Sequence, residues 1–134
     1  MSYIINHIHI KTDDPDKVAE WYVEAFGFEI ISRRVRDFSP KLMDYFIVTQ
    51  SENGTRVNIS GARANETLPK IGSGVHEGLE HFGITVPDIE KELERLKGLG
   101  AKVLEEPLVT PEGAMLAFIE TPYDKSRVEI VQSL

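Results

Sequence analysis

Two histidines, His7 and His81, are each followed at the same spacing by an aspartate, Asp14 in the first case and Asp88 in the second. Imidazole nitrogens and carboxylate oxygens are common protein ligands of divalent metals, and imidazole also exchanges protons near neutral pH. A duplicated segment places equivalent polar residues in related positions, so two copies can surround one ligand or metal from two sides. The spacing therefore indicates a site built from two copies of one unit.

The repeat continues into the elements that would position these histidines. Asp14 and Asp88 each precede a helical pattern of apolar residues that ends at a glycine, Gly27 in the first copy and Gly100 in the second. Aspartate before a helix and glycine after it are typical of helix ends. Strand-like segments align at 28–35 with 101–104 and at 55–59 with 126–130. We therefore predict two βαβββ modules, at about 1–60 and about 80–134, joined by residues 61–79.

Alternation along the strands separates apolar from polar side chains, because successive residues of a strand point to opposite faces of the sheet. One face is expected to lie under the helices and carries apolar residues: Ile4, Ile8, Ile10, Val57, Ile59, Phe82, Ile84, Val128 and Ile130. The opposite face carries the polar candidates: His7, His9, Arg56, Asn58, Ser60, His81 and Glu129. If that uncovered face is concave, it forms a pocket.

Composition fits a single domain, residues 1–134, that can bury one core or two small half-cores, since 41% of its residues are hydrophobic. There is no apolar run of the roughly 20 residues needed to cross a bilayer, and no signal segment begins the sequence. We therefore expect a cytoplasmic protein that does not bind membranes. The net charge of −7 argues against general nucleic-acid binding. With no cysteine in the chain, a metal would be held by nitrogen and oxygen ligands.

The two copies resemble the vicinal-oxygen-chelate superfamily, also called the glyoxalase and bleomycin-resistance superfamily, over almost the whole chain. The residues that carry the resemblance are His7–Asp14, Trp21-Tyr22, Phe26–Phe28, His81–Asp88, Gly100 and Arg127–Gln132. The resemblance implies an α+β fold in which two βαβββ modules form an open mixed-sheet half-barrel around one site, with the helices on the outer faces. It also implies one divalent metal ion, whether Ni, Zn, Co, Mn or Fe, and a homodimer.

Carried over from the family position by position, the metal ligands fall on His7, Asn58, His81 and Glu129. Asn58 departs from the pattern, because an amide oxygen is a weak neutral ligand and many lyases of the family have a carboxylate or a glutamine there. Without Asn58 the set is two histidines and one carboxylate, which suits ferrous iron and dioxygen chemistry. With Asn58 the set resembles the isomerases and lyases.

Three further residues are predicted to line the pocket: His9, Ser60 and Arg56. His9 shares a face with His7 and is an alternative ligand. The second copy carries Gly83 at the matching position, which favours His7 as the ligand and His9 as a pocket residue.

The leading functional interpretation is a metal-dependent enzyme, a glyoxalase-like lyase or an isomerase or epimerase. It would act on a small substrate with adjacent oxygens through a metal-stabilised enolate, with Glu129 as the catalytic base. One alternative is an Fe(II) ring-cleaving dioxygenase of the extradiol type that uses His7, His81 and Glu129. Another is a non-enzymatic small-molecule binding or resistance protein. The sequence does not identify the substrate or the metal.

Overall fold

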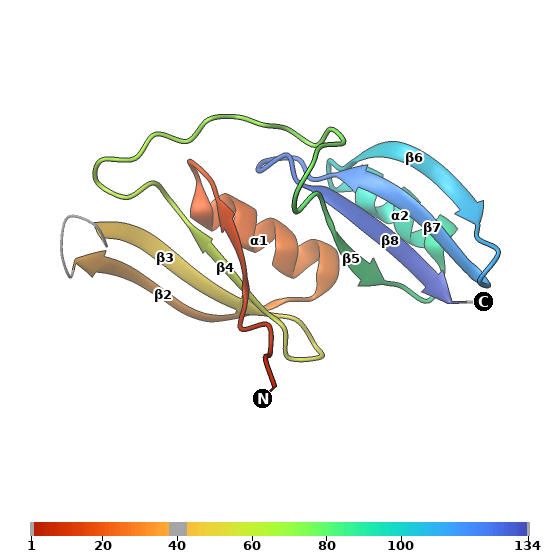
Figure 1. Ribbon diagram of the computed structural model, residues 1–134, viewed down its shortest axis with the longest axis horizontal. Coiled ribbons are helices and arrows are strands. Elements are labelled where there is room, and N and C mark those ends of the chain that lie inside the picture. The colour runs from red at the N-terminus through yellow and green to blue at the C-terminus, as the bar shows by residue number, and fades with distance from the viewer. Residues whose placement is uncertain (1, 38–42, 134) are drawn as a thin grey trace. The chain divides into compact units, whose positions relative to one another are not determined.

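The computed structural model describes residues 2–37 and 43–133. Within these ranges, two helices and eight strands follow one another as two consecutive βαβββ series (Figure 1). The chain divides into two compact units, Met1–Pro69 and Lys70–Leu134, and the division lies inside the predicted joint at 61–79. Each unit is therefore described by itself.

The helix of the first unit, α1 (Pro15–Phe26), begins and ends where the sequence predicts. The side chain of Asp14 accepts a hydrogen bond from the backbone N–H of Lys17, and Pro15 occupies the first turn, where no N–H is needed. Gly27 ends the helix in the left-handed conformation, with φ of 69°. The buried face of α1 is apolar and includes Val18 and Tyr22.

The helix of the second unit, α2 (Ile89–Gly98), follows the same plan. The side chain of Asp88 accepts a hydrogen bond from the backbone N–H of Lys91, and the chain turns at Gly100 with φ of 99°. Leu93 and Leu96 are buried on one face, whereas the solvated face carries charged residues. No helix among the described residues is long and apolar enough to cross a membrane.

Each unit contains one four-stranded mixed sheet. The first unit has the order β1-β4-β3-β2 and the second β5-β8-β7-β6. The pairs β1–β4 and β5–β8 are parallel, and the other pairs are antiparallel. The bounds in the first unit are β1 (Ile8–Lys11), β2 (Glu29–Asp37), β3 (Met43–Gln50) and β4 (Arg56–Ser60). Those in the second are β5 (Phe82–Thr85), β6 (Lys102–Val109), β7 (Ala114–Glu120) and β8 (Arg127–Ser133). The predicted fold class, with two mixed open sheets and two βαβββ series, is confirmed.

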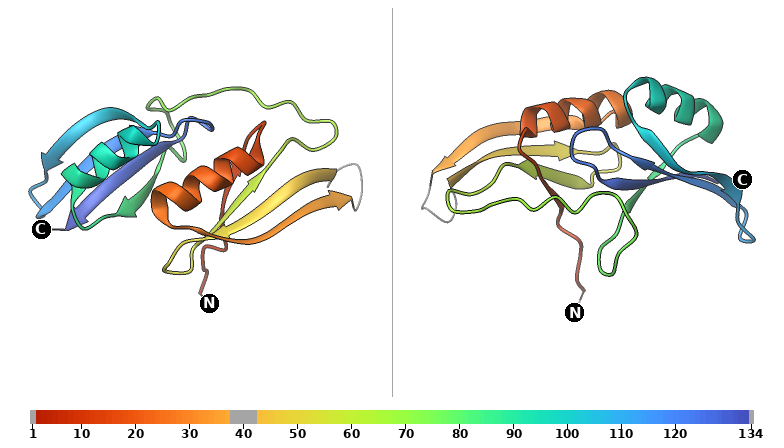
Figure 2. Two further views of the ribbon diagram at one scale, coloured as in Figure 1. Left: turned by 180° about the vertical axis from the view of Figure 1, so that it is seen from behind. Right: turned by 90° about the horizontal axis from the view of Figure 1, so that it is seen from above.

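In each unit the helix lies across one face of its own sheet, as the views in Figure 2 show. The side chains beneath it are those that alternation predicted: Val57 and Ile59 in the first unit, and Val128 and Ile130 in the second, are at most 2% exposed. Burying this apolar area supplies the main driving force for folding each unit. The opposite face of each sheet is free of its own helix, and it carries the candidate residues.

Two details of the sequence prediction are wrong. Ile4 was expected on the buried face of the first strand, but β1 begins at Ile8 and Ile4 is 87% exposed. The strand predicted at 101–104 extends to Val109, because β6 continues through two irregularities in its pairing with β7. Such irregularities interrupt the regular alternation on which the sequence prediction relied.

Candidate functional site

The uncovered face of the second unit brings together two of the predicted ligands. Gly83 of β5 lies opposite Glu129 of β8 in a parallel pair. His81 immediately precedes β5, and alternation places it on the same side of the sheet as Glu129. Nε2 of His81 lies 3.3 Å from Oε1 of Glu129, and both side chains are partly exposed, at 32% and 22%. A nitrogen and an oxygen donor therefore face one another at one place on this sheet.

The surroundings of His81 fix its ring. Nδ1 lies 2.8 Å from Oε1 of Glu80, and the ring packs edge-on against Phe118 with centroids 4.9 Å apart. The contact with His81, together with the positive charge of Arg127, lowers the pKa of the Glu80 carboxyl. An ionised carboxylate accepts hydrogen bonds and cannot donate them, so Nδ1 is the nitrogen that carries the proton in this contact.

A buried arginine lies beside this pair. Arg127 is 8% exposed, its guanidinium lies over the Phe118 ring at 4.5 Å, and it forms an ion pair with Glu105. It also donates to the backbone oxygen of Ser73 at 3.2 Å, and its Nε lies 3.6 Å from Oε1 of Glu80. Sequence reasoning missed Arg127, Phe118 and Glu80 as site residues. The only signal available was that Glu80 precedes His81 and that Arg127 shares a strand face with Glu129.

In the first unit the predicted ligands lie near the start of β1 and on β4. His7 precedes β1 and is exposed, and its Nδ1 lies 2.8 Å from Oδ1 of Asn6. Asn58 is half-buried and lies opposite His9 in the parallel β1–β4 pair. His9 therefore occupies in this unit the place of Gly83 in the second, as the alignment of the two copies predicted.

His9 is engaged through its other nitrogen. Its Nε2 lies 2.8 Å from the hydroxyl of Ser60, and its ring packs edge-on against Phe46 with centroids 5.4 Å apart. Partial desolvation of the ring lowers the pKa of His9, and the nearby charges of Lys11, His7 and Arg36 lower it further. Ser60 itself is fully buried. The third predicted pocket residue, Arg56, pairs with Gln50 at the start of β4, and its exposed side chain forms no hydrogen bond or ion pair with the described part of the chain.

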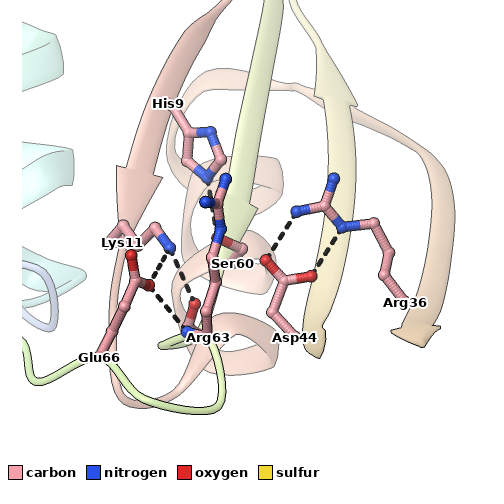
Figure 3. A network of polar contacts seen from close by, with 8 residues as sticks. His9, Lys11, Arg36, Asp44, Ser60, Arg63 and Glu66 are labelled. Atoms are coloured by element: carbon pink, nitrogen blue, oxygen red, sulfur yellow. Dashed lines mark hydrogen bonds and ion pairs between the residues drawn. The ribbon is translucent and has the colours of Figure 1, made fainter. Parts of the chain in front are cut away.

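A network of charged residues continues from His9 along the first unit (Figure 3). Asp44, whose side chain is completely buried, accepts two hydrogen bonds from Arg36, at 2.7 and 2.8 Å. This bidentate contact holds the pKa of the Asp44 carboxyl below its ordinary value. The Arg36 guanidinium also stacks on Phe46 at 4.1 Å. No local pattern in the sequence points to Asp44, because its partner is set by the register of β2 on β3.

Two further cations complete this network. Lys11 forms an ion pair with Glu66 at 2.7 Å, and Glu66 also accepts from the backbone N–H of Arg63 at 2.8 Å. Nε of Arg63 is buried and has no hydrogen-bond partner among the described residues. Figure 3 draws Arg63 in the same group of polar side chains as His9, Ser60 and Glu66. The Nε donor of the Arg63 guanidinium is therefore unused among the described residues.

The donor chemistry of the second unit fits a divalent metal. Two ligands of one ion lie at about 2.0–2.2 Å from it when they are imidazole nitrogen and carboxylate oxygen, so their atoms come close to each other, as those of His81 and Glu129 do. Across the described ranges, 2–37 and 43–133, no group of three or more histidine, aspartate or glutamate side chains is already gathered around one point. His81 and Glu129 are thus half of the predicted set, and His7 and Asn58 lie in the other unit.

Comparison with known proteins gives consistent results. The family model described as Glyoxalase/Bleomycin resistance protein/Dioxygenase superfamily matches residues 4–130. A probable chloroplastic lactoylglutathione lyase of Arabidopsis thaliana is 30% identical over 128 residues, which are 94% of this chain and 35% of that protein. A probable lactoylglutathione lyase of Synechocystis is 25% identical over 131 residues, covering 95% of this chain and 93% of its own length. The chain thus spans about a third of the plant relative's length.

The fold is also found among solved structures. A glyoxalase family protein from Bacillus cereus superposes on this chain with a TM-score of 0.83. The superposition covers 100% of this chain and 96% of that one at 15% sequence identity. At that identity the likeness concerns the fold alone, and it agrees with the two βαβββ series described above.

Proposed function

Because the chain belongs to the Glyoxalase/Bleomycin resistance protein/Dioxygenase superfamily, we propose that it is a divalent-metal-dependent lyase or isomerase of the glyoxalase type. The observation that carries this proposal is the approach of His81 Nε2 to Glu129 Oε1, at 3.3 Å. With Nδ1 donating to Glu80, Nε2 of a neutral His81 has only a lone pair to offer. A nitrogen and a carboxylate oxygen this close are held together by a proton on Nε2 or by a cation that both ligate, and a divalent metal is the cation proposed here.

The proposed ligands are His7, His81 and Glu129, with Asn58 as a weak fourth. A bound divalent metal would act as a Lewis acid and stabilise negative charge on two adjacent oxygens of the substrate. Glu129 then has a second role as the base that takes a proton from the neighbouring carbon, since a carboxylate can serve as ligand and as base. His9 stays outside the ligand set, because its Nε2 is engaged with Ser60.

The first substrate to test is suggested by the relatives, which are named as lactoylglutathione lyases. Lactoylglutathione carries a thioester carbonyl next to a hydroxyl-bearing carbon, so it presents the two adjacent oxygens that the proposal requires. Glutathione adducts of this kind are therefore the proposed substrate class.

Two measurements test the proposal. Elemental analysis and calorimetric titration with Ni²⁺, Zn²⁺, Co²⁺ and Mn²⁺ measure metal binding, and His81→Ala should abolish it. The exposed His76, whose Nδ1 contacts the backbone oxygen of Glu77, provides the control, and His76→Ala should leave metal binding unchanged. In D₂O, the metal-loaded protein should exchange the hydrogen on the hydroxyl-bearing carbon of lactoylglutathione for deuterium. A protein that binds none of these ions and catalyses no exchange would overturn the proposal.

The two alternative functions are distinguished by the same experiments. The named relatives favour neither the ring-cleaving dioxygenase nor the non-enzymatic binding protein. Bound iron together with oxygen uptake on a catechol would indicate the dioxygenase, and tight binding of a small molecule without metal would indicate the binding protein. The homodimer and the cytoplasmic location are still predictions, for which analytical ultracentrifugation and fractionation of the host cell are the direct measurements.

A further inference from the structure

The two candidate ligand histidines share a contact that the sequence repeat did not reveal. Nδ1 of His7 lies 2.8 Å from the side-chain oxygen of Asn6, and Nδ1 of His81 lies 2.8 Å from a side-chain oxygen of Glu80. In both units the partner is the residue immediately before the histidine. Both units therefore have a side-chain oxygen of the preceding residue at Nδ1 of the histidine, although that residue is asparagine in one and glutamate in the other.

The other histidines of the chain are bonded differently. His9 is held through Nε2, by the hydroxyl of Ser60, and His76 contacts a backbone oxygen, that of Glu77, through Nδ1. The chain has four histidines. The two at equivalent positions of the repeat, His7 and His81, are those whose Nδ1 contacts a side-chain oxygen of the preceding residue.

The contact has a chemical consequence. A neutral imidazole carries one proton, so a ring that donates from Nδ1 leaves the lone pair on Nε2. The carboxylate of Glu80 can only accept, so at the 2.8 Å contact the proton lies on Nδ1 of His81. Glu80 lies closer to the ring than Glu129 does, 2.8 Å against 3.3 Å, and thus favours the form of His81 with the proton on Nδ1 and the lone pair on Nε2.

Glu80 is itself held in place. Nε of Arg127 lies 3.6 Å from the same Glu80 oxygen that contacts His81. Arg127 cannot easily move away, because it is buried against Phe118 and is bound by Glu105 and by the backbone of Ser73. The ring of His81 is therefore oriented by a carboxylate that a buried cation supports.

We propose that Asn6 and Glu80 are positioning residues that fix the Nδ1-protonated tautomer of His7 and His81, and thereby direct Nε2 of each ring to a divalent cation. The part of this proposal that concerns the cation rests on the proposed metal-dependent function. Because a carboxylate makes a bonded imidazole more basic than a neutral amide does, Glu80 should strengthen its histidine as a ligand more than Asn6 does.

The first experiment needs no metal. Nitrogen-15 NMR of the metal-free protein at about pH 8.5, well above the ordinary range of imidazole titration, reports which ring nitrogen carries the proton. The parent protein should show His81 protonated on Nδ1, and Glu80→Ala should shift the ring toward the Nε2-protonated form. Asn6→Ala should do the same for His7. Glu77→Ala removes a charge from the same exposed loop and should change neither ring. A tautomer of His81 that is unchanged in Glu80→Ala would overturn the proposal.

The second experiment measures affinity for Ni²⁺ and Zn²⁺ by calorimetry. Glu80→Ala should weaken binding by about 10- to 100-fold, the usual effect of losing such a supporting contact. Glu80→Gln, which keeps an oxygen acceptor as Asn6 does but lacks the charge, should recover part of this loss, and Glu77→Ala should bind as the parent does. Equal affinities of the parent and Glu80→Ala would contradict the proposal.

The two experiments separate the positioning role from the function on which it rests. If the parent protein binds no divalent ion, the metal-dependent function fails, while the tautomer of His81 still decides the role of Glu80. Circular dichroism and thermal unfolding test whether each variant is still folded. We expect the parent fold in both, because Glu80 and Asn6 lie outside the helices and strands.

Discussion

Oε1 of Glu129 on β8 and Nε2 of His81 beside β5 lie 3.3 Å apart, on the face of the second sheet that its helix does not cover. The parallel pairing of β5 with β8 creates this proximity, since it brings the start of one strand next to the start of another that lies far along the chain. Glu129 is therefore placed to act both as a ligand beside His81 and as the proposed base, and its substitution tests both roles.

Glu129→Gln should separate metal binding from proton transfer. The amide keeps the size of the side chain and an oxygen donor, but it cannot act as a base. We expect deuterium exchange into lactoylglutathione to fall by about 10²- to 10⁴-fold, while some metal affinity persists. The exposed Glu112, replaced by glutamine, is the control and should exchange at the parent rate. Exchange at the parent rate in Glu129→Gln would show that another group takes the proton.

Asp44→Asn should destabilise the first unit. The change leaves the Arg36 guanidinium, whose side chain is only 15% exposed, without its charged partner. Breaking a buried ion pair in this way should lower the free energy of unfolding by about 2–4 kcal/mol in urea denaturation. Arg33→Ala breaks an exposed pair with Asp16 and should cost no more than about 1 kcal/mol. Equal effects of the two variants would contradict the burial argument.

The same aspartate should contribute to acid sensitivity. The pKa of Asp44 is lower in the folded chain than the ordinary value of 3.8, so the folded state binds this proton less readily than the unfolded state. The resulting stabilisation is complete above the ordinary pKa and is lost as the pH falls through the folded value. Urea denaturation between neutral pH and strongly acidic pH should therefore show a steeper loss of stability for the parent than for Asp44→Asn.

His9 should titrate below the ordinary histidine value of 6.5, and NMR can follow it. Because the folded state disfavours its cation, stability is lost as the pH falls from about 6.5 through the folded pKa. Lys11→Met removes a neighbouring positive charge and should raise the pKa of His9 toward 6.5. Lys17→Met, on the helix, should not change it. A His9 titration at or above 6.5 in the parent protein would refute the expected shift.

Two glycines at helix ends should respond oppositely to alanine. Gly27 has φ of 69°, a conformation that an alanine adopts only with strain, so Gly27→Ala should lower the stability by about 1 kcal/mol. Gly98 is the last residue of α2, has no positive φ, and an added methyl group there meets nothing within 4 Å. Gly98→Ala should therefore stabilise the chain by about 0.5–1 kcal/mol. Thermal unfolding of both variants measures the difference.

The repeat in the sequence predicted much of the fold because its signals are local. Aspartate and glycine at the helix ends and alternation along the strands depend on residues close in sequence, and α1 and β4 follow those signals closely. β1 is shorter than predicted, because the exposed Ile4 does not join the sheet although its residue type suits a strand.

The partners of the candidate residues were harder to predict. Glu80 and Arg127 lie close together because β5 and β8 pair in one particular register. No pattern in either segment predicts that register. Asp44 likewise depends on the hairpin register of β2 and β3. The identities of the predicted ligands came from the repeat and the family resemblance, whereas the residues that hold those ligands are brought to them by strand pairing between distant segments.

The pairing of the first strand with the fourth has a consequence for synthesis of the protein. All strand pairs recorded among the described residues join strands of one unit, and the first sheet needs nothing beyond Ser60. A chain leaving the ribosome thus has every strand of that sheet available before the second helix has been made, and domains generally fold as units in this order. The slow step in each half should be closure of the long loop between its first and last strands, a step that each half can complete independently.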